Sequence, residues 1–262
     1  KITGTKERGG AKIPLINGKI YAGRVGNYHI DTDSDNNLKS LTDEAIGTYN
    51  FDADEKVESI TKGEITYNLK EHKTLNDAIA LASGDQDKLN KASSTVVYKD
   101  DIFRLDDEGK ATSVQLSNKN ELTVKDPAAF DPNTIYTLKI SKIKFASGEK
   151  FTLTGDHTYG NVRNYEKVAG KFLLKHGNQY KNSVYEDGTH KFTVTGAGEN
   201  KYTLTETKDG KKVSEEKLEN GILKTVKYEA DGTTVKSVDI VDKADGDNDT
   251  VTVDTEATSV AN

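Results

Sequence analysis

Turn dipeptides recur through the C-terminal half of this chain at intervals of about ten to twelve residues, and this spacing constrains the fold most. Two such turns bracket one strand. The segments between them carry apolar residues on one face and Lys, Glu or Thr on the other, which is typical of a half-solvated sheet. The sequence therefore predicts an antiparallel β meander over 157–242. The turns are Asp187-Gly188, Gly196–Asn200, Asp209-Gly210, Asn220-Gly221 and Asp231-Gly232, and the strands are Lys191–Thr195, Tyr202–Thr207, Lys211–Leu218, Ile222–Glu229 and Thr234–Val241.

The middle of the chain, over 93–156, also lacks a helix pattern. Short apolar alternations separated by Gly, Asp and Asn turns predict a β-sandwich there. The expected strands are Thr95–Tyr98, Ile102–Leu105, Thr112–Leu116, Glu121–Val124, Ile135–Ile140 and Lys150–Leu153.

The first part of the chain, 1–92, mixes both patterns. Asn17-Gly18 predicts a hairpin between Ala11–Ile16 and Lys19–Val25, because both turn residues tolerate positive φ. A short helix is expected over Leu38–Ile46, with Ser40 or Thr42 as the N-cap. Thr74-Leu-Asn-Asp77 resembles a capping box with Asp in place of Glu, and it predicts a helix through Ala78–Ala82 and again over Gln86–Ala92. This pattern indicates an α+β segment.

The composition fits several small modules better than one large core. Of the 262 residues, 33% are hydrophobic and 31% are charged, so much of any sheet must stay solvated. We therefore expect a mainly β, multi-domain chain. It comprises an α+β segment at 1–92, an Ig-like sandwich at 93–156, a meander domain at 157–242 and an acidic linker or tail at 243–262.

Several classes of protein are disfavoured. The chain has no Cys, which excludes disulfides, thiolate metal sites and thiol catalysis. A formal net charge of −6 with interspersed signs disfavours nucleic-acid binding. The longest apolar run, Ala78–Ala82, is too short for membrane insertion by a helix. The start at Lys1 suggests a processed chain or an excised fragment of a longer one.

The segment Ala128-Ala-Phe-Asp-Pro-Asn-Thr-Ile-Tyr-Thr-Leu-Lys-Ile-Ser-Lys-Ile-Lys-Phe-Ala-Ser-Gly148 follows the strand pattern Asn120-Glu-Leu-Thr-Val124. Over about 96–153 it resembles the late strands of bacterial Ig-like modules found in S-layer and other surface proteins. In those modules a Pro-Asn-Thr-x-Tyr-Thr motif enters a strand. Pro132 would fix φ at the turn, and Tyr136, Leu138 and Ile140 would form one strand face. The resemblance brings no active site with it.

A second stretch, Lys208–Thr234, resembles the hairpin ladders of bacterial surface proteins, including spirochaetal outer-surface lipoproteins. Motifs for choline binding, LPxTG-type sorting and S-layer homology are not visible in the sequence. The mode of attachment to a cell is therefore not indicated.

Catalytic motifs are weak, and we expect no enzyme. The five histidines show no HExxH or paired metal spacing, and no G-x-S-x-G elbow or phosphate loop is present. An acid–base role for His157 beside Asp156 and Tyr159 is conceivable, but a histidine in a surface loop is the simpler interpretation.

Two carboxylate clusters are candidate calcium sites, because alternating oxygen ligands suit that ion. The clusters are Asp31, Asp33 and Asp35, and then Asp242, Asp245, Asp247 and Asp249. Asn36 and Thr42 stand where an EF-hand needs Gly and Glu, so a standard EF-hand is excluded. The alternatives are an acidic solvated turn for the first cluster and a flexible linker for the second.

Three functions stay open at this stage. The first is a structural protein of the bacterial cell surface, such as part of an S-layer subunit, that associates with itself or with neighbouring subunits. The second is an adhesin or lipoprotein-like module that binds a host protein, a glycan or a cell-wall polymer. The third is a secreted glycoside hydrolase, which is disfavoured because the chain has no Trp and any sugar-stacking cleft would depend on its 12 tyrosines. All three imply an extracellular location.

Overall fold

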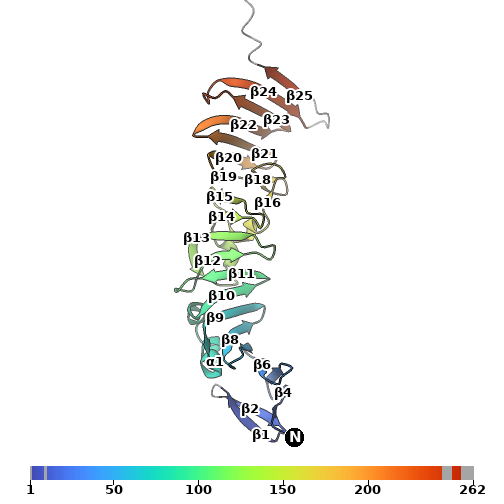
Figure 1. Ribbon diagram of the computed structural model, residues 1–262, viewed down its shortest axis with the longest axis vertical. Coiled ribbons are helices and arrows are strands. Elements are labelled where there is room, and N and C mark those ends of the chain that lie inside the picture. Colours follow the sequence, from blue (N-terminus) through green and yellow to red (C-terminus); the bar gives the residue numbers. More distant parts are fainter. Residues whose placement is uncertain (1, 9–10, 244–249, 255–262) are drawn as a thin grey trace, which may run out of the picture. The chain divides into compact units, whose positions relative to one another are not determined.

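A computed structural model of the protein describes residues 2–8, 11–243 and 250–254 (Figure 1). The chain forms two compact units, Lys1–Leu138 and Lys139–Asn262. Both consist mainly of antiparallel β-strands, as the sequence predicts. The unit boundary falls inside the segment predicted as an Ig-like sandwich, and the structure does not confirm that sandwich. The boundaries at 92 and 156 stay predictions of where independently folding domains would divide.

The first unit contains a small three-stranded sheet, a longer meander and two helices. The small sheet consists of β1 (Gly4–Arg8), β2 (Ala11–Ile16) and β3 (Lys19–Ile20). The meander consists of β4 (Gly23–Val25), β5 (Tyr28–Thr32), β6 (Leu38–Asp43), β7 (Gly47–Phe51), β8 (Val57–Lys62), β9 (Ile65–Lys73), β10 (Ser93–Tyr98), β11 (Asp101–Leu105), β12 (Lys110–Gln115) and β13 (Glu121–Ala129), with α1 (Leu75–Ser83) and α2 (Gln86–Ala92) between β9 and β10.

Each meander strand pairs with the next one along the chain, and from β5 to β13 this register places one buried residue per strand in a single row. Paired residues share a face of the sheet, so the row is a continuous apolar stripe. It consists of Ile30, Leu41, Tyr49, Ile60, Tyr67, Val96, Phe103, Val114 and Leu122, all at most 5% exposed.

The neighbouring positions form a parallel row of mostly polar side chains on the opposite face. Cross-strand hydrogen bonds join several of them, such as Asn50 Nδ2 to Ser59 Oγ at 3.0 Å and Asn68 Nδ2 to Thr95 Oγ1 at 2.8 Å. The row consists of Asp31, Ser40, Asn50, Ser59, Asn68, Thr95, Arg104, Ser113 and Thr123.

The two helices contribute to the core of the first unit. The predicted cap of α1 is confirmed, because Thr74 Oγ1 accepts the Asp77 N–H at 3.2 Å and donates to Asp77 Oδ2 at 2.8 Å. Leu75, Ala78 and Leu89 are at most 1% exposed. Phe130 lies at the centre of an aromatic cluster, edge-on to Tyr67, Tyr98 and Phe103 at centroid distances of 5.2–6.3 Å.

Many hairpins share one turn, in which a residue with positive φ closes the loop and the first residue of the turn accepts a backbone hydrogen bond. Aspartates strengthen this turn at three places. Asp33, Asp52 and Asp106 each accept the N–H groups of the residues two and four positions ahead, at 2.8–3.0 Å. The closing residues are Asn36, Glu55, Gly109, Lys119, Gly148 and Gly232.

The helix predicted over Leu38–Ile46 is wrong, because Leu38–Asp43 is strand β6. Leu38 and Leu41 lie three residues apart, which suggests one helix face. The structure buries both through a β-bulge: Asp31 pairs with Ser40, whereas Thr32 pairs with Leu38. The extra residue returns Leu41 to the inner face. Bulges in β8 and β12 likewise bring Val57 to the same inner face as Ile60, and Ala111 to the same inner face as Val114.

The strand predicted over Ile135–Ile140 is also wrong in its first half. Ile135–Thr137 forms a 3₁₀ turn, labelled η1, and the next strand begins only at Ile140. The Asp131 carbonyl accepts the N–H groups of Thr134 and Ile135, so Asp131-Pro132 tightens the chain instead of extending it. Ile135 and Leu138 are both buried by this turn.

The second unit contains another meander and a small sheet beside it. The meander consists of β14 (Ile140–Lys144), β15 (Lys150–Leu153), β19 (Ser183–Asp187), β20 (His190–Gly198), β21 (Lys201–Lys208), β22 (Lys211–Glu219), β23 (Ile222–Tyr228), β24 (Val235–Asp242) and β25 (Thr250–Asp254). Between β15 and β19 lie α3 (Tyr159–Val162), β16 (Glu166–Lys167), β17 (Leu174–His176) and β18 (Gln179–Lys181), and these last three strands form the small sheet. The strands predicted between the turns from Lys191 to Val241 are thus confirmed as β20 to β24, whereas 157–182 holds α3 and the small sheet, and the meander itself already begins at β14.

In the second unit, Tyr202 is the last fully buried residue among those whose side chains are described. Leu173, Val194 and Tyr202 form one buried cluster of this unit with half-buried neighbours such as Tyr180 and Leu218. From Thr203 to Lys243 every residue is at least partly exposed. In the part of the chain that the structure describes, strands β22 to β24 therefore hold no fully buried residue, and only Leu218 and Leu223 of these strands pack against that cluster.

Substitution of Gly47 tests the close approach between strands β7 and β8. A Cβ there would lie 2.1 Å from the Thr61 carbonyl oxygen, at a φ of +152°. We expect Gly47→Ala to lower the free energy of unfolding by roughly 3 kcal/mol or more, because strain and overlap add. Gly63→Ala is the matched control: its φ is +59° with no atom within 4 Å, so it should lower that free energy by only about 1 kcal/mol. Urea unfolding followed by circular dichroism measures both, and equal effects would contradict this account.

Candidate functional site

The first carboxylate cluster lies in the turn between β5 and β6. Asp33 Oδ1 accepts backbone N–H groups of Asp35 and Asn37 at 2.9 and 2.8 Å, and Asp33 Oδ2 accepts Asn37 Nδ2 at 2.9 Å. The hydrogen bonds from Asn37 hold the pKa of Asp33 below its ordinary value. Asp31 belongs to β5, with its Oδ1 at 3.5 Å from His29 Nε2. The Asp33 carboxylate thus stabilises the turn through these hydrogen bonds.

The second carboxylate cluster is described only at Asp242, at the end of β24, where it pairs with Ile222. Asp245, Asp247 and Asp249 lie outside the described residues. Within the described ranges, no group of three or more His, Asp or Glu side chains is gathered in a way that would hold a metal ion. Calcium binding stays a prediction.

His157 is buried, and both its ring nitrogens are hydrogen-bonded. Nε2 donates to the Thr154 carbonyl at 2.8 Å, so in the neutral ring Nδ1 accepts the hydroxyl of Tyr165 at 2.8 Å. Burial is the main cause that lowers the pKa of His157, and it raises the pKa of Tyr165 to about 12. The structure therefore joins His157 to Tyr165 instead of Tyr159, in a contact that fixes the loop.

An aromatic strip lies along the second unit. The ring of Phe172 stacks on Tyr185 and is tilted by 36° against Phe192, each at a centroid distance of 4.3 Å, and His190 lies beside Phe192 at 6.2 Å. His190 Nδ1 is 2.8 Å from Glu206 Oε1, so polar groups border the rings. These rings are half-buried and part of their surface meets solvent. Sequence reasoning missed this strip, because its members come from a loop and two separate strands.

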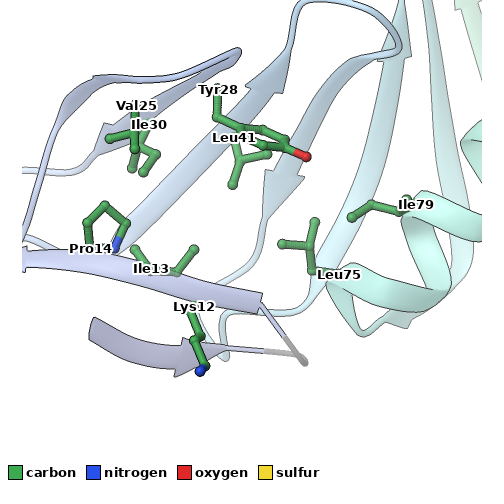
Figure 2. A pocket seen from close by; sticks show the side chains of 9 residues that line it. All are labelled: Lys12, Ile13, Pro14, Val25, Tyr28, Ile30, Leu41, Leu75 and Ile79. Carbon is green, nitrogen blue, oxygen red and sulfur yellow. The ribbon is translucent and has the colours of Figure 1, made fainter. Parts of the chain in front are cut away.

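An apolar pocket of about 230 Å³ lies in the first unit between β2, strands β4 to β6 and α1 (Figure 2). The ring of Tyr28, which is 43% exposed, reaches across it toward α1. In the same view the Lys12 side chain extends away from the other side chains that line the pocket. The lining residues are Lys12, Ile13, Pro14, Val25, Tyr28, Ile30, Leu41, Leu75 and Ile79.

Tyr49 does not line this pocket, and its buried hydroxyl lacks a partner among the described residues. Tyr49 pairs across the sheet with Leu41, which lines the pocket. It is 1% exposed, and among the described residues its hydroxyl has no hydrogen-bond partner. Burial first, then the charges of Asp43 and Tyr28, raise its pKa to about 12. A buried hydroxyl without a hydrogen-bond partner lowers the free energy of unfolding by about 1–3 kcal/mol.

One sequence signal could have revealed the bulged hairpins. The order Asp, three residues, Asn or Lys, an apolar residue, any residue, Ser and an apolar residue occurs at Asp33–Leu41, Asp52–Ile60 and Asp106–Val114. Each copy encodes one turn, one bulge and two core residues. The pocket has no comparable signal, because its lining comes from five elements.

Neither a known family model nor a curated protein matches this chain. Among the described residues, no helix is long and apolar enough to cross a membrane. The resemblance to surface-protein modules stays a prediction.

The pKa shift of His157 predicts a pH dependence of stability. An unfolded histidine titrates near 6.5, whereas the folded one binds its proton only at lower pH. The unfolded state therefore binds more protons as the pH falls through 6.5, and the free energy of unfolding should decrease until the folded pKa is passed. Urea unfolding between pH 7.5 and 5 measures this slope. His157→Gln should flatten it and His176→Gln, at an exposed site, should not; an unchanged slope in His157→Gln would refute the prediction.

Proposed function

We propose that this protein is a non-enzymatic structural component of a bacterial cell surface, part of an S-layer or related array, that associates with itself outside the cell. The observation that carries the proposal is the exposed face of β23 and β24 that lies opposite Leu223. Its apolar side chains are in part open to solvent, and association of copies would cover them.

That face bears an apolar patch, which we define as Ile222, Val226, Val238 and Ile240. Val226 pairs with Val238, and the alternation of β23 and β24 places all four on the same face. Ile222 is 44% exposed. Lys224 and Asp242 lie among them on this face, so contacts between copies would combine apolar burial with ion pairs.

Self-association is tested with charge placed on this patch. We expect the wild-type chain to form oligomers that sedimentation velocity detects and electron microscopy shows as sheets or fibres, and added calcium should favour them if the predicted ion binds. Val226→Lys should abolish these oligomers, because burying its ammonium group against an apolar partner is unfavourable.

Thr225→Lys is the matched control, since Thr225 lies on the same strand but on the other face, between Glu216 and Asp239. It should leave association intact. A wild-type chain that stays monomeric at high concentration, with and without calcium, would contradict the proposal.

The aromatic strip favours a second function, that of an adhesin for a glycan. Stacked rings next to a His–Glu pair offer both a flat apolar surface and hydrogen-bonding groups, which sugar rings require. Cell-wall polymers and host glycans share this chemistry.

A glycan array tests the second function. Phe172→Leu should weaken binding of any recognised glycan by roughly three- to tenfold, because an aliphatic chain fills space but loses ring stacking. Phe145→Leu, at a ring edge-on to Phe151 and not in contact with Phe172, is the control. The absence of binding by the wild type, or equal binding by Phe172→Leu, would remove this function from consideration.

A further inference from the structure

The pocket in the first unit has the dimensions of a small ligand site. An apolar cavity of about 150 Å³ holds one benzene molecule. At about 230 Å³, this pocket has room for a ring with a small substituent and is smaller than typical sites for drug-sized ligands.

Among the lining residues of the pocket, Tyr28 and Lys12 have polar side chains. Figure 2 shows the Tyr28 hydroxyl on the side of α1, close to Leu75 and Ile79, whereas the Lys12 amine lies on the far side of β2. Lys12 is the one charged residue of this lining, and its side chain extends away from the other lining side chains in that view, so a charged ligand among the apolar side chains would lie without a close counter-ion.

We propose that this pocket binds a small neutral molecule, an aromatic ring or a comparably short chain that carries one hydroxyl group. Its apolar part lies against Ile30, Leu41 and Leu75, and its hydroxyl group exchanges a hydrogen bond with the hydroxyl of Tyr28. This ligand site is independent of self-association, because its residues lie in the first unit and the patch lies in the second.

A pair of probes of nearly equal shape tests the proposal: 4-methylphenol and para-xylene, which differ by one hydroxyl in place of one methyl. Ligand-observed NMR and titration of backbone amide shifts measure both affinities. We expect both probes to bind, with 4-methylphenol about tenfold tighter, which corresponds to one net hydrogen bond.

Three variants assign the site. Ile79→Trp should fill the pocket and abolish binding of both probes, and Asn76→Trp, at an exposed position of the same helix, should not. The variant Tyr28→Phe should bind para-xylene as the wild type does and lose the preference for 4-methylphenol.

The thermal unfolding of each variant, followed by circular dichroism, checks that it is folded. Should Ile79→Trp not fold, changes in the amide chemical shifts of Leu41 and Ile79 when the probes are added to the wild type still assign the site.

Three results would overturn the proposal. One is no binding of either probe at millimolar concentration. Another is binding that Ile79→Trp leaves intact while folded. The third is a wild-type chain that forms oligomers and binds no probe, while Ile79→Trp dissociates those oligomers. That result would mean that an apolar side chain of a second copy occupies the pocket. Equal affinities of the two probes would refute the proposed hydrogen bond between the ligand hydroxyl and the pocket.

Discussion

The alternation of side chains along strands that pair in sequence order is the constraint on which this structure depends. In the first unit it produces an apolar row from Ile30 to Leu122 with one member per strand. Such a row tolerates no slip of register, because a shift of one residue would exchange the apolar row for the polar one. The aspartate turns and the bulges that follow them fix the register hairpin by hairpin, so local chemistry secures a core that spans many strands.

Local signals in the sequence predicted local elements well. The Asn17-Gly18 hairpin, the Thr74 cap and the strands between the later turns are present, because each depends on residues a few positions apart. The predicted second strand of that hairpin, Lys19–Val25, was too long: it ends at Ile20, and Gly23–Val25 is β4, which pairs with β5 in another sheet. The helix over Leu38–Ile46 failed because a bulge imitates helical spacing. The strand over Ile135–Ile140 failed because Asp131 and Pro132 tighten the chain into a 3₁₀ turn. In both cases hydrogen bonds of the backbone overrode the pattern of apolar residues.

Interaction sites were harder to predict than elements. Asp33 was predicted as a metal ligand from its spacing, yet its oxygens accept hydrogen bonds within the turn, a role that the same Asp-rich spacing also encodes. The aromatic strip and the apolar pocket join residues far apart in sequence. Phe172 and Phe192 meet only because β19 and β20 pair next to the small sheet. Without knowledge of which strands pair, the sequence cannot place such residues together.

The end of burial at Tyr202 implies an order in which the second unit comes apart. Local opening is easiest where few apolar contacts are broken, so β23 and β24 should open while the packing around Leu173 and Tyr202 persists. Their amide hydrogens would then exchange early, and proteases would cut there first. A partner that covers this sheet would close that route, and the lifetime of the protein in the presence of proteases would then depend on its state of assembly.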